Sequence, residues 1–175
     1  MKFGSHALAV RRRTIVKWSV LVVTVAIAIV IDLVTKHLAE QHLAMGEVHK
    51  VLPFLYLQRT ANPGVAFGLF GGRTAFIVPA NVVALLVVMA YVWMERRPVF
   101  AGISGGLIVG GSLGNLIQRL SGDGRVTDFL KFPSWPNFNM ADFFLVVGIC
   151  VVVLGLIIET VRVYKAGRRE TPARR

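Results

Sequence analysis

The chain has 175 residues, 55% of them hydrophobic, and its mean hydropathy is +0.65. This length indicates one domain, and this composition excludes an ordinary soluble protein. The formal net charge of +11 does not indicate nucleic-acid binding, because the basic residues cluster at the two termini and in one short loop, where membrane proteins carry their orientation signal.

Four apolar segments are each long enough to cross a bilayer as a helix. They cover about residues 17–37, 74–94, 98–118 and 141–162. We therefore predict an all-α membrane protein built as a bundle of four transmembrane helices.

The basic residues orient this bundle, because Lys and Arg favour the cytoplasmic side of a membrane. They concentrate in residues 1–16, between the second and third spans, and in a tail, 166–175, that we expect to be disordered. Both termini of the membrane domain, residues 17–165, are thus predicted to be cytoplasmic. The segments 38–73 and 119–140 then face outward.

The first span follows a basic segment, which is also how a cleaved signal peptide begins. No small-x-small cleavage site follows its apolar run, and Asp32 and Lys36 come instead, so we expect an uncleaved span. These two residues are four apart and share one helix face, within reach of an ion pair. Either the pair only neutralises itself near the interface, or Lys36 contacts a lipid head group or braces a neighbouring loop.

The segment after the first span has local structure of its own. Val48–Leu57 is rich in Val, Leu, Phe and Tyr and predicts short or edge strands around Pro53. Ala61–Gly64 predicts a turn, and the apolar stretch Val65–Phe70 after it predicts a piece that lies on the lipid surface.

The third span carries glycines at every fourth position, a spacing that lets another helix approach closely. They are Gly102, Gly106, Gly110 and Gly114, with Gly105 and Gly111 beside them. This stripe predicts a compact bundle rather than a pore.

Two aspartates near the fourth span are candidates for chemistry. Asp128 lies in a short strand-like run, and Asp142 lies in the first turn of the fourth span, where Asn139 can cap the helix. Pro133 and Pro136 turn the chain between them. Two carboxyls brought together do not both ionise readily, so one can take a proton from water while the other polarises a carbonyl. We expect Asp142 to be the ionised member.

Other constellations are less convincing. Asp123 fits a turn residue. The histidines of the segment after the first span lack metal-site spacing, and Cys150 stands alone in an apolar run, which fits a small packing residue. No metal site is therefore predicted.

Four motifs follow one another along the chain. They are Asp32-x-x-x-Lys36, Asn62-Pro63-Gly64-Val65-Ala66-Phe67-Gly68, Gly114-Asn115-Leu116-Ile117-Gln118-Arg119 with Val126-Thr127-Asp128-Phe129, and Phe138-Asn139-Met140-Ala141-Asp142. In this order they resemble the lipoprotein signal peptidase (signal peptidase II) family. The resemblance covers the chain from about Asp32 to the end of the fourth span.

The resemblance implies a membrane aspartyl endopeptidase of the bacterial inner membrane, with its active site at the outer face and no cofactor. It implies cleavage of prolipoprotein signal peptides before a diacylglyceryl-modified cysteine, contact with membrane lipids, and inhibition by globomycin. Residues 43–72 resemble the family's small extracytoplasmic β-structured cradle.

The resemblance also assigns site residues. Asp128 and Asp142 match the family's catalytic pair. The positions that match substrate-binding or site-bracing residues are Asp32, Lys36, Asn62, Gly64, Phe67, Asn115, Arg119 and Asn139.

One position departs from the family pattern, which has Asp where this chain has Gln118. Gln118 can still hydrogen-bond Arg119 but supplies no charge. We expect activity to survive, and an inactive native protein that Gln118→Asp restores would contradict this.

The residues alone leave two other classes of function open. One is a carrier or proton-coupled transporter that uses the aspartates and Lys36 as a relay, although transport favours polar groups near mid-membrane and internal repeats, and neither is visible. The other is a non-enzymatic scaffold, in which the aspartates would be dispensable.

Overall fold

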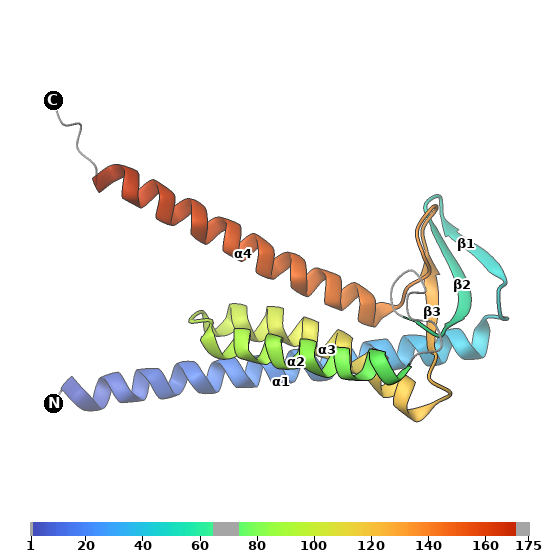
Figure 1. The fold of residues 1–175 in the computed structure, drawn as a ribbon, viewed down its shortest axis with the longest axis horizontal. Helices are drawn as coiled ribbons and strands as arrows, with labels where there is room; N and C mark the ends of the chain where they lie inside the picture. The colour runs from blue at the N-terminus through green and yellow to red at the C-terminus, as the bar shows by residue number, and fades with distance from the viewer. Residues whose placement is uncertain (1, 65–73, 171–175) are drawn as a thin grey trace.

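The computed structural model describes residues 2–64 and 74–170. In these residues four long helices form a bundle, and three strands form a small sheet at one end of it (Figure 1). We call this end the sheet end. In chain order the elements are α1 (Lys2–His42), β1 (Val48–Leu52), β2 (Leu55–Asn62), α2 (Thr74–Met94), α3 (Pro98–Ser121), β3 (Val126–Lys131) and α4 (Met140–Glu170).

Each helix is long and apolar enough to cross a membrane, which confirms the predicted fold class. α2 has the predicted bounds, whereas α1 begins at Lys2 and α3 continues to Ser121. The prediction of a disordered tail from residue 166 is wrong as far as Glu170, because α4 continues there. Pro172 is the first proline after α4 begins, so no strong helix breaker precedes it. Residues 171–175 lie outside the described part of the chain.

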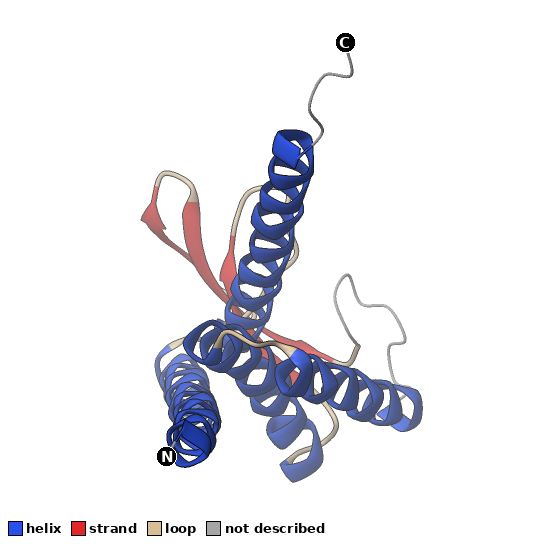
Figure 2. Cartoon of the chain, turned by 90° about the vertical axis from the view of Figure 1, so that its left-hand side faces the viewer, coloured by secondary structure: helices blue, strands red, loops and turns tan. Residues whose placement is uncertain are grey.

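α3 is the central helix. Of its most apolar stretch 67% is buried, against 11% to 17% for the other three helices, because α3 packs against all of them. α4 packs along α3 from Ala141 at the sheet end to Gly155, which lies against Phe100 near the start of α3. The part of α4 beyond Gly155 stands apart from α1 and α2 in both views (Figures 1 and 2).

The glycine stripe makes the α1–α3 contact, as predicted. A Cβ atom on Gly106 would lie 2.6 Å from Thr24 Cβ, and one on Gly110 would lie 2.7 Å from Ala28 Cβ. Such distances are too short for any side chain larger than hydrogen, so the two backbones approach closely. Gly114 continues this face to Asp32 at the sheet end.

The sheet is antiparallel in the order β1-β2-β3, with Asp128 of β3 opposite Thr60 of β2. The strands predicted in Val48–Leu57 are present, since β1 and β2 pair around the turn at Pro53. The apolar stretch Val65–Phe70 lies outside the described residues.

The chain that links β3 to α4 folds back along β3. Leu130 and Phe138 exchange two backbone hydrogen bonds, Leu130 N to Phe138 O at 2.8 Å and Phe138 N to Leu130 O at 2.9 Å. Ser134 takes a left-handed conformation in the turn between them (φ 59°). In an antiparallel pair, moving two residues back on one strand means moving two forward on the other. The start of α4 is therefore beside Asp128.

Candidate active site

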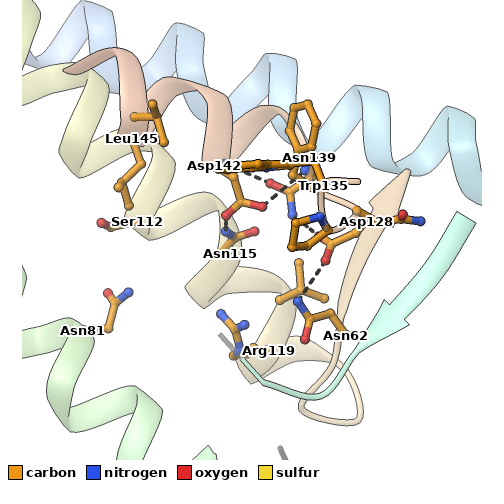
Figure 3. A pocket seen from close by; sticks show the side chains of 15 residues that line it. Asn62, Asn81, Ser112, Asn115, Arg119, Asp128, Trp135, Asn139, Asp142 and Leu145 are labelled. Carbon is orange, nitrogen blue, oxygen red and sulfur yellow. Dashed lines mark hydrogen bonds between the residues drawn. The ribbon is translucent and has the colours of Figure 1, made fainter. Parts of the chain in front are cut away.

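Asp128 and Asp142 come together at the sheet end, as their sequence context predicts. Asp128 lies in β3 and is only 2% exposed, between the sheet and the helices. Asp142 lies in the first turn of α4. Both side chains border one cavity (Figure 3).

Asn139 is the N-cap of α4, as predicted, and it contacts both carboxyl groups. Its Oδ1 accepts the backbone N–H of Asp142 at 3.0 Å, and its own N–H donates to Asp142 Oδ2 at 3.2 Å. Its Nδ2 donates to Asp128 Oδ1 at 2.6 Å. One fully buried residue thus caps the helix and joins the two acids.

Two further carboxamides donate to the acids. Asn62 Nδ2 donates to Asp128 Oδ2 at 2.9 Å, and Asn115 Nδ2 donates to Asp142 Oδ1 at 2.8 Å. In each, the carboxamide oxygen accepts from a group that can only donate, the Gly64 N–H at 2.8 Å and the Lys36 ammonium at 2.7 Å. These partners fix which end of each carboxamide faces a carboxyl group.

The environment of Asp128 favours its protonated form. Burial, and after it the nearby charge of Asp142, raise the pKa of Asp128 to about 7. The donated hydrogen bonds from Asn62 and Asn139 oppose this shift. Asp128 is thus a carboxyl group that holds a proton near neutral pH.

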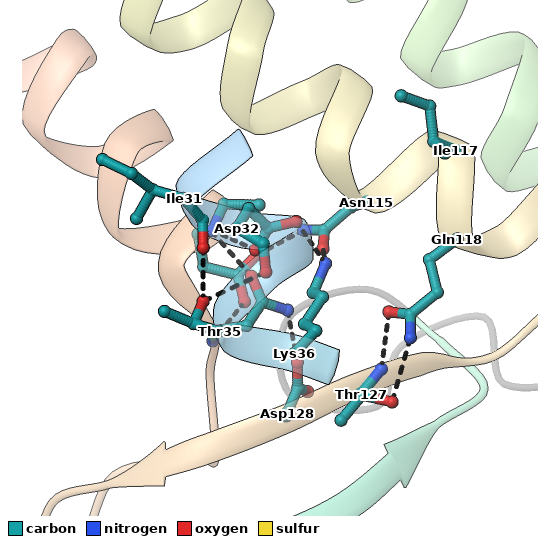
Figure 4. Close-up of polar contacts among 12 residues, drawn as sticks. Ile31, Asp32, Thr35, Lys36, Asn115, Ile117, Gln118, Thr127 and Asp128 are labelled. Carbon is teal, nitrogen blue, oxygen red and sulfur yellow. Dashed lines mark hydrogen bonds and ion pairs between the residues drawn. The ribbon is translucent and has the colours of Figure 1, made fainter. Parts of the chain in front are cut away.

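Asp32 and Lys36 form the ion pair that their spacing predicts, at 2.7 Å, but they lie inside the bundle (Figure 4). Lys36 is only 2% exposed, so the alternative in which it contacts a lipid head group is wrong. It braces Asn115 of α3 rather than a loop. Asp32 Oδ1 accepts the N–H of Ala141 at 2.8 Å, which fixes the first turn of α4 to α1.

Arg119 connects α3 to the end of β2. Its Nη2 donates to the Gly64 carbonyl, next to the turn that holds Asn62. Its Nε is buried without a hydrogen-bond partner among the described residues, and the side chain borders the cavity. Phe67, predicted to belong to the site, lies outside those residues.

Gln118 does not bond Arg119, so that expectation is wrong. Its carboxamide points the other way along α3, toward β3 (Figure 4). Gln118 Oε1 accepts the Thr127 N–H at 2.9 Å, and its Nε2 donates to Thr127 Oγ1 at 3.0 Å and to Glu40 Oε1 at 2.9 Å. Glu40 also accepts the Thr127 hydroxyl. This network holds β3 one residue before Asp128.

The cavity beside the acids has a volume of about 320 Å³ and extends from the sheet end into the bundle. It includes residues that the sequence did not single out, such as Asn81 of α2 and Ser112 of α3. No signal marked them, because each is an isolated polar residue within an apolar span. No group of three or more metal-ligating side chains occurs in the described part of the chain.

Known proteins resemble this chain over most of its length. A sequence model of the signal peptidase (SPase) II family matches residues 24–158. The chain belongs to the signal peptidase II family. This is a family of aspartic peptidases, so the protein is a membrane protease of that class.

Individual members of the signal peptidase II family are also similar to this chain in sequence. The lipoprotein signal peptidase of Desulfitobacterium hafniense is 38% identical over 140 residues, which are 78% of this chain and 92% of that protein. The lipoprotein signal peptidase of Brucella ovis is 36% identical over 143 residues, 78% of this chain and 88% of that protein.

Solved structures share the fold. One described as a bacterial membrane enzyme matches 87% of this chain and 93% of its own, with a TM-score of 0.75 and 24% identity. A second structure, also described as a bacterial membrane enzyme, matches 77% of this chain and 90% of its own, with a TM-score of 0.69 and 26% identity. The multi-pass architecture is therefore that of a known bacterial membrane enzyme.

Proposed function

We propose that Asp128 and Asp142 are the catalytic pair with which this signal peptidase II removes signal peptides from prolipoproteins, before a diacylglyceryl-modified cysteine. The observation that carries the proposal is that Asn139 joins buried Asp128 to half-buried Asp142 at the border of one cavity. A scaffold has no need for two carboxyl groups held together in a partly buried site, since removing each from water adds a cost of desolvation.

The pair divides the chemistry of peptide hydrolysis. Asp142, at the N-terminus of α4 where the helix dipole favours negative charge, takes a proton from water, and the hydroxide oxygen bonds to the scissile carbonyl carbon. Asp128 donates its proton to the carbonyl oxygen. Asp142 then gives its proton to the leaving nitrogen, the C–N bond breaks, and the returning oxygen proton restores Asp128.

The surroundings hold this geometry. Asn62, Asn115 and Asn139 orient the carboxyl groups, and the Asp32–Lys36 pair braces them from α1. Arg119 and Gly64 position the turn beside Asp128. The reaction as written needs no cofactor. The cavity is of a size to admit cyclic peptides of the globomycin type in part, and we expect these to compete with substrate.

The orientation is part of the proposal. The basic residues of segment 1–16, of the α2–α3 connection and of the α4 end lie away from the sheet end (Figure 1). By the positive-inside rule the end of the bundle opposite the sheet end faces the cytoplasm, on the inner side of the bacterial inner membrane, and both termini lie there. The acids then lie at the outer face, where the lipid anchor of a prolipoprotein holds the cleavage site among membrane lipids.

A cleavage assay tests the catalytic assignment. Purified protein in detergent is mixed with a diacylglyceryl-modified prolipoprotein, and the products are separated on a gel. Asp128→Asn and Asp142→Asn should each slow cleavage by at least about 10²–10⁴-fold. Asp123→Asn is the matched control, because Asp123 is an exposed turn residue. Robust cleavage by either of the first two variants would remove the assignment.

A further inference from the structure

Asn81 is an unusual residue in its surroundings. It lies within the membrane-spanning part of α2, and its Oδ1 is buried without a hydrogen-bond partner in the described residues. A buried amide oxygen without a partner destabilises a protein, and more so where hydrocarbon replaces water. Nothing in residues 2–64 and 74–170 gives a reason for this group to be polar.

Asn81 borders the same cavity as the two acids. Figure 3 shows its side chain directed from α2 toward the space that Ser112 and Asn115 border from α3. Asn81 is seven residues from the start of α2, about 10 Å along the axis at 1.5 Å per residue. Asp142 lies in the first turn of α4. The cavity thus leads from the acids down to Asn81.

A substrate that crosses the membrane needs hydrogen-bond acceptors at this depth. A peptide bond must leave helical structure to reach two carboxyl groups, and the residues before it then lose their internal hydrogen bonds. In hydrocarbon each freed N–H needs another partner. The wall of the cavity near Asn81 is largely apolar, with Leu145 and Val146 on α4. An unpartnered carboxamide oxygen is the complement of a freed backbone N–H.

We propose that Asn81 binds substrate by accepting a backbone N–H from the unwound part of the signal peptide. The depth of Asn81 below the start of α2, about 10 Å, corresponds to about three extended residues before the cleaved bond, at about 3.3 Å per residue. This inference rests on the proposed function and adds to it a contact that selects for extended backbone rather than for a particular side chain.

The test compares wild-type enzyme with Asn81→Leu on a set of synthetic diacylglyceryl lipopeptides. In each lipopeptide one backbone amide before the cleaved bond is replaced by an ester, which removes a single N–H. We expect one ester position to lower kcat/KM of the wild type by about 3- to 10-fold, the range for one neutral hydrogen bond, and to leave Asn81→Leu unaffected. Asn81→Leu itself should lose about the same factor on the all-amide substrate.

Two controls separate this role from a structural one. Ser104→Ala removes a buried hydroxyl of α3 that bonds Phe100 O and Tyr91 outside the cavity, and it should keep the ester sensitivity of the wild type. Thermal unfolding of Asn81→Leu in detergent should occur no lower than that of the wild type, because Oδ1 has no partner to lose among the described residues.

The outcomes are distinct. Equal ester sensitivity of wild type and Asn81→Leu at every position would overturn this inference alone, as would a lowered unfolding temperature of Asn81→Leu. A wild-type protein that cleaves no lipopeptide would overturn the proposed function, and this inference with it.

Discussion

Lys36 and Asn115 are joined at 2.7 Å, and the same carboxamide of Asn115 donates to Asp142 at 2.8 Å. A buried cation on α1 thereby sets the orientation of a hydrogen-bond donor to a carboxyl group on α4. Because the Lys36 ammonium can only donate, it holds the oxygen of the Asn115 carboxamide and leaves the NH2 group to face Asp142. The buried ion pair is therefore part of the active-site geometry as well as of the bundle.

Replacing Lys36 should separate these two roles. Lys36→Met leaves Asp32 as an unpaired buried charge and should lower the free energy of unfolding by about 3–5 kcal/mol. Adding Asp32→Asn should recover most of this stability but not the cleavage rate, because Asn115 still lacks its partner. Thermal unfolding and lipopeptide cleavage of the single and double variants measure the two effects. Full activity in the double variant would show that Lys36 serves the fold alone.

The pKa of Asp128 sets the alkaline limit of activity. With its pKa raised to about 7 by burial and by Asp142, Asp128 holds its proton below neutral pH and loses it above. The proposed mechanism needs that proton, so kcat should decline above pH 7, by about tenfold per pH unit once the group is mostly ionised. Rates at saturating substrate from pH 5 to 9 measure this. A rate that stays constant to pH 9 would contradict the role of Asp128 as the acid.

The same shift predicts how stability depends on pH. In the folded protein the pKa of Asp128 is about 7, whereas in the unfolded chain it returns to its ordinary value of 3.8. The stabilisation is thus complete below pH 3.8 and is lost at about 1.4 kcal/mol per pH unit as pH rises from there to about 7.

Asp128→Asn, which has no proton to lose, should remove this part of the pH dependence and unfold at a higher temperature than the wild type at pH 8. Unfolding curves in detergent at pH 5 and pH 8 provide the comparison. The variant is expected to be inactive at both, so stability and activity would move in opposite directions. An identical pH dependence in both proteins would show that Asp128 does not carry the shift.

Gln118 and Glu40 form a donor–acceptor pair that a second carboxylate would disrupt. Gln118→Asp removes the N–H group that donates to Glu40 Oε1 at 2.9 Å and brings a second carboxylate close to Glu40. Repulsion between the two carboxylates strains the geometry in which residue 118 accepts the Thr127 N–H. We expect a loss of about 1–3 kcal/mol in stability and slower cleavage. Adding Glu40→Gln restores a donor and should recover both. Faster cleavage by Gln118→Asp alone would contradict this reading of the network.

Local patterns predicted much of the site. The four-residue spacing of Asp32 and Lys36, and Asn139 before an apolar run, each describe an interaction within one helix or at its end, and both are present. Glu40 was not singled out, because its partners Gln118 and Thr127 are distant in sequence and it resembles an ordinary helix charge. The predicted partner of Gln118 was wrong for the same reason, because the direction of the Gln118 side chain depends on where β3 packs against α3.

The helix ends were also only partly predictable. The predicted spans end near charged residues, but charge does not end a helix, and α1 and α4 both continue past the predicted ends. The cavity and the burial of Asn81 depend on how three helices meet, which no single segment encodes.

The backbone pairing of Leu130 with Phe138 has a consequence for biosynthesis. Both acids belong to one short stretch that ends in the first turn of α4. The two carboxyl groups can therefore come together only after α1, α2 and α3 have been synthesised and the ribosome has begun α4.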